Sequence, residues 1–357
     1  MIGIYGPEIP PVPGGVSDHT LALARALEAD GAPPVVLADR GDAALFAPLT
    51  CITGLKPGDV AAAAKAQGVT TVLVQYVPFL FARRGVSPAL VRGVQRMHAA
   101  GLKIAVVVHE AFVPFNRLPW LVTGVPQRLQ FGYLVRRATD VYAPLPRYAE
   151  IARRYAGPET HVSVAPIGAT IPCSKLSRIE ARTRLGLGDG RVAIGIFSPA
   201  ASGFAHEWIA AAAARLAGHP KVTWVRFGFG SARALPGYPD GPNVMTVGET
   251  SAETVADTMR ALDIAAAPYT DGLTMRRSGA MLALAHGIPV VSSEGHLFDP
   301  SLRALAACEP DPTAFAERLA QLVDDPALRA AWSLRANGYG EQASIEALAR
   351  RMLRDLT

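Results

Sequence analysis

Short apolar runs alternate with longer amphipathic segments along almost the whole chain. Each run has the length of one buried β-strand, and each amphipathic segment has apolar positions at helical spacing. In the first half, the predicted strands are Ile2–Tyr5, Val35–Leu37, Val69–Val74, Lys103–Val108, Val141–Ala143 and His161–Val164. The predicted helices are Asp18–Ala29, which Ser17 is expected to cap, Asp59–Ala66, Pro88–Ala100, Pro126–Arg137 and Arg147–Tyr155. Strands in regular alternation with helices predict a parallel sheet that helices cover on both faces.

The alternation pauses at Ala165–Lys175, a segment with prolines and a glycine, and then starts again. The second series has predicted strands at Val192–Phe197, Val222–Phe227, Asn243–Val247, Ile264–Ala267 and Pro289–Ser292. Its predicted helices are Phe204–Leu216, Ala252–Ala261, Arg276–His286, Thr313–Val323, Pro326–Ala336 and Ser344–Leu356. We therefore predict an α/β chain with two doubly wound, Rossmann-like domains, residues 1–170 and 171–340, and a final helix within 341–357. Ligands of such sheets bind at the carboxyl ends of the strands, so the expected site lies in a cleft that both domains face.

Composition sets broad limits on the function. Half of the 357 residues are hydrophobic and 18% are charged, which excludes long disordered tails. The net charge of +5 and the pI of about 9.2 fit a phosphate-bearing ligand, an anionic membrane surface, or a basic protein that uses its charge for neither. The widely spaced Cys51, Cys173 and Cys308 predict reduced thiols. No leader or long apolar segment is apparent, so we expect a cytoplasmic protein.

The most informative stretch is Pro268–Ser293. A predicted strand there ends in a glycine loop that carries an acid, and a helix is expected to begin near Arg276. The backbone N–H groups of Leu273 to Arg276 would then form an anion site at a helix N-terminus. Arg276 and Arg277 add two permanent charges suited to phosphate oxygens. The alternative, two arginines on a solvated helix face, is less favoured because the glycine loop follows a buried strand.

This stretch resembles the donor-site motif of family 4 retaining glycosyltransferases, which have the two-domain GT-B fold. Asp271 stands where the first glutamate of that motif is expected, and the resemblance implies that Asp271 binds sugar hydroxyls. The neighbouring positions that match the motif or join the expected donor site are Gly272, Leu273, Thr274, Ser278, Ala280, Met281 and Gly287–Val291.

The resemblance extends over most of the chain. The further matching motifs are Gly14–Gly15 in "PGGV", His109 in "VVVHE", Gly228 and Gly230 in "FGFG", and Gly248 with Glu249 in "VGE". The resemblance implies that the first glycines approach the donor phosphates, that His109 lines the sugar pocket, and that the others lie near the nucleotide. From the residues alone, His109 is either such a pocket residue or a packed, hydrogen-bonded histidine.

Two positions depart from the family pattern. The family keeps an arginine and a lysine after the first strand of its second domain, whereas Phe197–Trp208 contains neither, and His206 is the nearest basic group there. Gly279 replaces the second glutamate, whose carboxylate would bind ribose hydroxyls. Arg276 and Arg277 are expected to take over the charge of the diphosphate.

The resemblance implies a retaining transfer of a sugar from a nucleoside diphosphate donor. The expected catalytic residues are His109 and Asp271, which match family motifs, and Arg276 and Arg277, which would replace the missing cations. Catalysis would be electrostatic and positional, without a firm protein nucleophile. No metal-ligand cluster with recognised spacing is present, so we expect neither a metal nor another cofactor. The final helix is expected to pack back on the first domain.

Aromatic segments in the first domain indicate the acceptor. Ala111–Leu134 combines aromatic side chains with Arg117 and Arg128, and Gln75–Gly85 has the same character. They suggest either an apolar or small-molecule acceptor with peripheral contact to the inner membrane face, or packing under the next helix.

Two other functions share this fold. A non-catalytic GT-B partner protein would explain the missing cations and Gly279, and a pseudo-glycosyltransferase would join cyclitols instead of sugars. Nucleic-acid binding is not expected because the basic residues are scattered. Dinucleotide-linked redox chemistry is not expected because no G-x-G-x-x-G follows the first strand.

Overall fold

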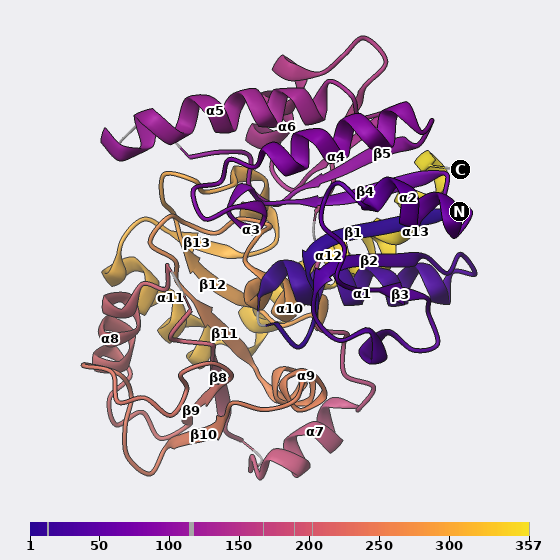
Figure 1. Ribbon diagram of the computed structural model, residues 1–357. Coiled ribbons are helices and arrows are strands. Elements are labelled where there is room, and N and C mark those ends of the chain that lie inside the picture. The colour runs from indigo at the N-terminus through magenta and orange to yellow at the C-terminus, as the bar shows by residue number, and fades with distance from the viewer. Residues whose placement is uncertain (13, 114–117, 167, 189, 202, 357) are drawn as a thin grey trace. The chain divides into compact units, whose positions relative to one another are not determined.

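The computed structural model describes residues 1–12, 14–113, 118–166, 168–188, 190–201 and 203–356 (Figure 1). The chain forms two compact units. The first comprises Met1–Ile167 with Ile345–Thr357, and the second comprises Gly168–Ser344. Each unit is built on one parallel sheet, so the predicted α/β class is confirmed.

The first unit has a sheet of seven strands in the order β3-β2-β1-β4-β5-β6-β7. The strands are β1 Ile2–Glu8, β2 Val35–Arg40, β3 Cys51–Ile52, β4 Thr71–Tyr76, β5 Lys103–Val108, β6 Asp140–Ala143 and β7 His161–Val164. The helices are α1 Gly15–Ala29, η1 Ala43–Phe46, α2 Val60–Ala66, α3 Pro78–Phe81, α4 Pro88–Ala99, α5 Leu118–Val135, α6 Pro146–Tyr155 and α13 Ile345–Leu356.

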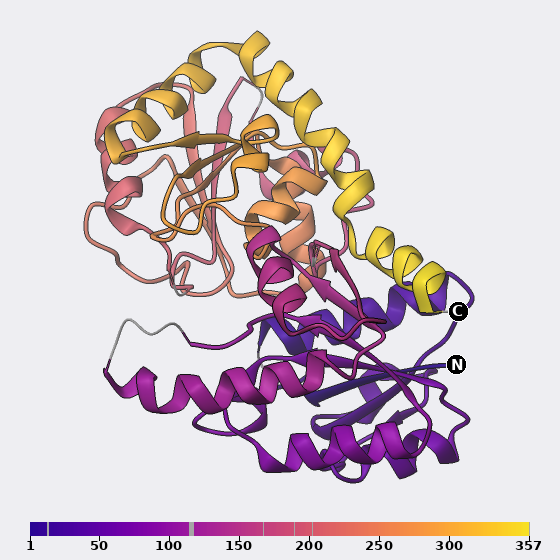
Figure 2. The same cartoon turned by 90° about the horizontal axis from the view of Figure 1, so that it is seen from above.

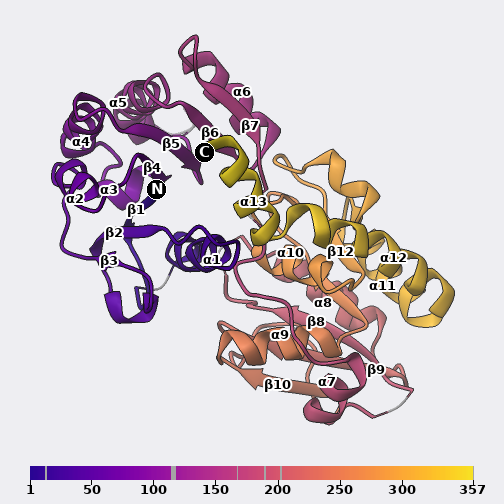
Figure 3. The same ribbon diagram turned by 90° about the vertical axis from the view of Figure 1, so that its right-hand side faces the viewer.

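Two hydrophobic cores cover the two faces of this sheet. One core joins apolar residues of the sheet to α2, α4, α5 and α6, and the other joins them to α1 and α13. Figure 3 shows α2, α4 and α5 on one side of the strands and α1 with α13 on the other. The yellow helix α13 lies beside α1 in Figure 2, and the two helices pack against each other. The last helix of the chain therefore completes the core of the first unit.

The second unit has a sheet of six strands in the order β10-β9-β8-β11-β12-β13. The strands are β8 Val192–Phe197, β9 Val222–Phe227, β10 Val244–Gly248, β11 Ile264–Ala267, β12 Val290–Ser293 and β13 Ala307–Glu309. The helices are α7 Arg178–Leu185, α8 His206–Arg215, α9 Ala252–Ala261, α10 Ser278–Ala285, η2 Pro300–Ala304, α11 Pro312–Asp324 and α12 Pro326–Ala343.

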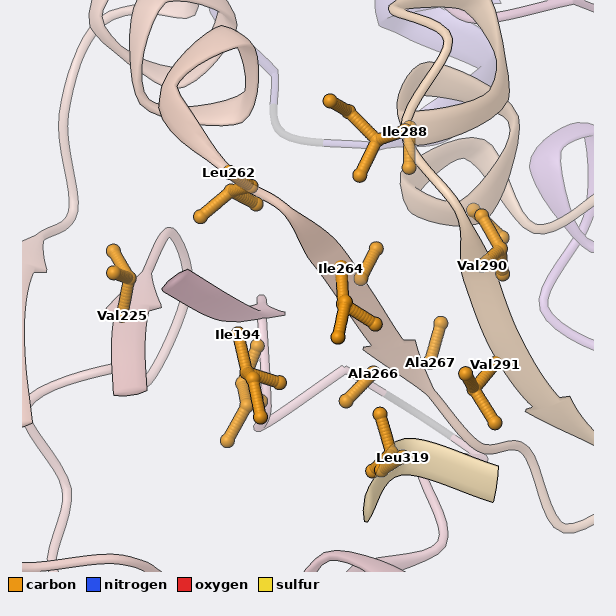
Figure 4. Packing of buried hydrophobic residues seen from close by; sticks show 14 of the residues in the cluster. Ile194, Val225, Leu262, Ile264, Ala266, Ala267, Ile288, Val290, Val291 and Leu319 are labelled. Atoms are coloured by element: carbon orange, nitrogen blue, oxygen red, sulfur yellow. The ribbon is translucent and has the colours of Figure 1, made fainter. Parts of the chain in front are cut away.

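Neighbouring strands of the second sheet contribute small and branched side chains to one core. Ile194, Ile264 and Val290 come from β8, β11 and β12, and Leu319 reaches the same region from α11 (Figure 4). Helices α8 and α11 pack together on one face, and α7 packs on α9 (Figure 1). This packing fixes the relative positions of the strand ends, from which the loops of the candidate site emerge.

Three sequence predictions are wrong about where helices begin. Helix α1 begins at Gly15 with Gly14 as its N-cap, so Ser17 lies inside the helix, where it is buried and caps nothing. Helix α5 begins at Leu118, well before the predicted Pro126, so much of the expected aromatic loop is helical. Helix α10 begins at Ser278 with Arg277 as its N-cap, so Arg276 precedes the helix. Among the described helices, none is both long and apolar enough to cross a bilayer.

Candidate functional site

The second sheet changes the direction of its strand order between β8 and β11. Strands β9 and β10 follow on one side of β8, and β12 and β13 follow on one side of β11. The loops that leave these two strands meet each other: Ala205 N–H donates to the Pro268 carbonyl at 3.1 Å, and Thr270 N–H donates to the Gly203 carbonyl at 2.9 Å. Ligands of doubly wound sheets bind at such a switch point.

The loop after β11 is fixed by the segment that follows β12. Leu273 N–H donates to the Ser293 carbonyl at 3.0 Å, and Asp299 N–H donates back to the Leu273 carbonyl at 3.0 Å. Gly272 has a φ of 90°, and a Cβ there would lie 2.6 Å from the Gly295 nitrogen. Only glycine fits this position. The loop thus reaches the switch point as a rigid element.

Two of the four N–H groups of the expected anion site, those of Leu273 and Arg276, have partners inside the protein. Leu273 N–H donates to the Ser293 carbonyl, and Arg276 N–H donates to the Thr274 hydroxyl at 3.4 Å. A phosphate at this loop would therefore depend mainly on side-chain cations.

The two arginines of this loop have different surroundings. Arg277 forms an ion pair with Asp271, and its guanidinium lies 4.4 Å from the centre of the Tyr269 ring. A Cβ at Gly203 would lie 2.9 Å from that guanidinium. Burial raises the pKa of the Tyr269 hydroxyl to about 12, although the guanidinium of Arg277 opposes the rise. Arg277 is thus held between the loops after β8 and β11, while the half-buried Arg276 is the neighbouring cation.

The glycine loop after β9 is held by the ends of its neighbouring strands. Gly228 and Gly230 have φ values of 77° and 72°, which favour glycine. Gly230 N–H donates to the Glu249 carboxylate at 3.1 Å, and Gly228 N–H donates to the Gly248 carbonyl at 2.9 Å. Glu249 therefore braces this loop. Any contact between Glu249 and a nucleotide remains a prediction.

An aromatic ring fills the space beside Gly279. A Cβ at Gly279 would lie 2.6 Å from Cδ1 of Phe197, and a Cβ at Gly228 would lie 2.7 Å from Cε2 of the same ring. Phe197 is half-buried at the end of β8 and packs on Phe227 with ring centres 5.1 Å apart. The sequence offered no signal for Phe197, because its two glycine neighbours lie far from it along the chain.

The first unit places its predicted glycines at the start of α1. Gly14 is the N-cap and Gly15 the first helical residue. Both are exposed, and an added Cβ at either position meets no described atom within 4 Å. The fold of this unit therefore leaves room at both glycines, as a binding loop requires.

His109 lies at the end of β5, and it is 7% exposed. Its Nε2 lies 2.6 Å from Oε1 of Gln75, which belongs to the neighbouring strand β4. The His19 ring meets the His109 ring edge to face, with ring centres 4.9 Å apart and planes at 81°. The histidine is thus packed and hydrogen-bonded, and it also lies at the carboxyl edge of the sheet where the pocket is expected.

Part of the aromatic segment packs inside the first unit. Phe112 and the fully buried Phe131 meet with ring centres 5.7 Å apart, and the Arg128 guanidinium lies 4.1 Å from the centre of the Phe112 ring. For these residues, the interpretation as packing is confirmed. The side chains of Phe115, Arg117, Trp120 and Leu121 lie outside the described residues.

Other side chains of α5 remain exposed. Val122, Val125 and Leu129 are 77%, 52% and 70% exposed and follow the spacing of one helix face. The buried amide of Gln127 ties α5 to the loop between α3 and α4, since its Nε2 donates to the Arg84 carbonyl at 3.0 Å.

The chain matches no family model and no curated protein sequence. Its solved structural neighbours include Anabaena HepE in complex with UDP, with 16% identity, a TM-score of 0.68, and coverage of 99% of this chain and 98% of that chain. A glycosyltransferase from Rickettsia africae has 13% identity, a TM-score of 0.70, and coverage of 99% and 96%. A putative UDP-N-acetylglucosamine 2-epimerase from Listeria monocytogenes has 13% identity, a TM-score of 0.63, and coverage of 99% and 95%. At these identities the likeness establishes the fold, and the prediction of a two-domain GT-B fold is confirmed.

Proposed function

We propose that this chain is a glycosyltransferase that moves a sugar from a nucleoside diphosphate sugar with retention of configuration. The observation that carries the proposal is the rigid loop after β11, which brings Asp271, Arg276 and Arg277 to the switch point of the second sheet. HepE, which shares the fold, is described in complexes with UDP and with UDP-glucose. Membership of family 4 remains part of the proposal.

The two arginines have separate roles in this reaction. As the bond between the sugar and the diphosphate breaks, negative charge grows on the leaving phosphate, and a nearby cation lowers the energy of that transition state. Arg276 supplies this cation. Arg277 holds the loop through Asp271 and Tyr269. Asp271 accepts hydrogen bonds from sugar hydroxyls and does not attack the sugar carbon.

The remaining predicted residues serve the donor and the acceptor. Gly14 and Gly15 leave space for the donor phosphates, and His109 lines the sugar pocket. The loops with Gly228 and Gly248 lie near the nucleotide. The proposed reaction needs no metal, so transfer is expected to persist in a chelator such as EDTA.

We propose that the acceptor is apolar or lipid-like and that the protein binds it at a membrane surface. The face of α5 with Val122, Val125 and Leu129 would insert among lipid chains. Such contact would hold the protein at the inner face of the membrane.

One observation favours a second candidate, a GT-B protein that binds without catalysing transfer. Phe197 fills the space beside Gly279, so no carboxylate can occupy it. Such a protein would bind a nucleotide weakly or not at all and would regulate another enzyme.

A two-step experiment separates these functions. Thermal shift against a panel of nucleoside diphosphates and their sugars first identifies the nucleotide. Release of that nucleotide in the presence of candidate acceptors, with the anomeric configuration of the product read by proton NMR, then tests transfer. Binding with retained configuration supports the proposal. A product of inverted configuration contradicts retention. If no compound of the panel shifts the melting temperature, the result supports the non-catalytic candidate.

A further inference from the structure

A second histidine is buried against His109. His19 lies in the first turns of α1, it is fully buried, and its ring meets the His109 ring edge to face at 4.9 Å. Neither ring nitrogen of His19 has a hydrogen-bond partner among the residues that the structure describes. The side-chain amide nitrogen of Gln75 is likewise buried without a described partner.

Packing alone does not account for an imidazole at this position. A buried polar group without a partner costs about 1–3 kcal/mol, and a phenylalanine ring would make a similar aromatic contact without that cost. Burial also lowers the pKa of His19 to about 4, so the ring stays neutral near pH 7. The neutral, unsatisfied ring of His19 beside His109 therefore lowers the free energy of unfolding, and packing does not explain its presence.

Gln75 connects the two histidines. Its Oε1 accepts the hydrogen bond from Nε2 of His109 at 2.6 Å, which places the His109 proton on Nε2. The same side chain acts on His19, where it partly opposes the lowering of the pKa by burial. The orientation of the Gln75 amide thus decides which nitrogen of His109 carries the proton.

We infer that His19 and Gln75 are positioning residues that fix the ring orientation and the tautomer of His109. The edge-to-face contact restricts rotation of the His109 ring, and the Gln75 carbonyl selects one of its two neutral forms. The inference deepens the proposed function, on which it rests for the role of His109 in the sugar pocket. A misplaced reacting group can cost roughly 100-fold in rate, so such support has a measurable effect.

Imidazole NMR on the full chain tests the positioning directly. Histidine labelled with ¹⁵N in both ring nitrogens reports the tautomer of each ring, and the signals that are lost in His109→Phe are those of His109. We expect His109 to carry its proton on Nε2 in the wild type. In His19→Phe and in Gln75→Leu, the His109 signals should shift toward a mixture of tautomers.

His286→Phe is the matched control. His286 is also buried, but Ser174 N–H donates to its Nε2 at 3.0 Å and its Nδ1 lies 2.8 Å from the Leu282 carbonyl. Its loss should leave the His109 signals unchanged. If His19→Phe and Gln75→Leu also leave them unchanged, His19 and Gln75 only pack against His109 and the inference is wrong. If His19→Phe does not fold, His19→Gln gives the same comparison.

Measurements of turnover distinguish a failure of this inference from a failure of the proposed function. With UDP-glucose as the probe, His19→Phe should lower kcat by roughly 10- to 100-fold and change KM by less than about threefold, while its Tm stays equal or rises. Unchanged kcat with an altered His109 tautomer would contradict a role for the tautomer in catalysis. If the wild type neither binds nor turns over any nucleotide sugar, the proposed function fails, and the NMR comparison still decides the positioning.

Discussion

At the scale of single residues, the structure gives contacts that bear on the task of one of the two loop arginines. The sequence predicted only that both arginines take over the charge of the diphosphate. The ion pair with Asp271 and the ring of Tyr269 assign the bracing task to Arg277. The pairs that decide this are six and eight residues apart in a loop without regular periodicity, which is why the sequence alone could not assign them.

Alanine substitutions should separate these tasks. Arg277→Ala leaves Asp271 without its cation and removes the stacked guanidinium, so we expect a loss of about 2 kcal/mol in the free energy of unfolding. Arg276→Ala should lower turnover by roughly 10²–10³-fold. Urea denaturation and steady-state kinetics on both variants provide the check. A turnover near wild type in Arg276→Ala would mean that the phosphate is held elsewhere, with His206 as the next candidate.

Phe197 should change how the ribose is recognised. Because its ring lies where a carboxylate would accept ribose hydroxyls, we expect the Kd values for UDP and dUDP to differ by less than about threefold. Calorimetric titration gives both values. The double variant Phe197→Ala with Gly279→Glu makes room for a carboxylate and should bind UDP at least about tenfold tighter than dUDP. A tenfold preference for UDP already present in the wild type would contradict this account.

His19 should make stability depend on pH. The folded chain lowers its pKa from 6.5 to about 4 through burial. Below pH 6.5 the unfolded chain binds a proton that the folded chain does not, so the free energy of unfolding falls as the pH drops, until about pH 4. The complete loss is about 3 kcal/mol.

The same measurement on variants isolates this residue. His19→Phe should lose about 2 kcal/mol less than the wild type when urea denaturation at pH 7 is repeated at pH 5. The control His98→Phe, at an exposed position, should follow the wild type. Equal losses in His19→Phe and the wild type would show that His19 titrates normally in the folded chain.

At the scale of elements, the long apolar runs predicted the strands well. Strands β5, β7, β8, β9 and β11 have the expected bounds. Strands β3 and β13 were not predicted, because segments of two or three residues are too short to show an alternating pattern of apolar and polar positions. The beginnings of α1 and α10 were wrong for a shared reason. Residue type alone cannot show that Ser17 faces the core or that hydrogen bonds to Ser293 and Thr274 keep the loop before Ser278 out of the helix.

Helix α5 carries the prediction that belongs to this scale. If its exposed apolar face enters a lipid surface, Leu129→Glu should lower binding to vesicles of phosphatidylglycerol and phosphatidylcholine by roughly tenfold. Leu334→Glu is the matched control, since Leu334 is 74% exposed on α12, against 70% for Leu129. Vesicle co-sedimentation measures both. Equal binding of the two variants and the wild type would remove the membrane from the proposal.

At the scale of the whole molecule, sequence periodicity was sufficient to predict two doubly wound sheets, and the structure has both. Each unit then brings its own candidate residues to the carboxyl edge of its sheet. The contacts of His19 with His109 and of Phe197 with Gly279 join positions about 80 to 90 residues apart, and only the fold reveals them. The sequence resemblance therefore located the candidate loops, while the contacts that their side chains make are visible only in the structure.

The central claim is that a nucleoside diphosphate binds at the loop after β11 through Arg276. Calorimetric titration of UDP into the wild type and into Arg276→Ala tests it most directly. We predict a saturable heat in the wild type and a Kd raised roughly 10- to 100-fold in the variant, the scale of one lost charge-assisted contact to phosphate. Equal Kd values for the two proteins would contradict the account.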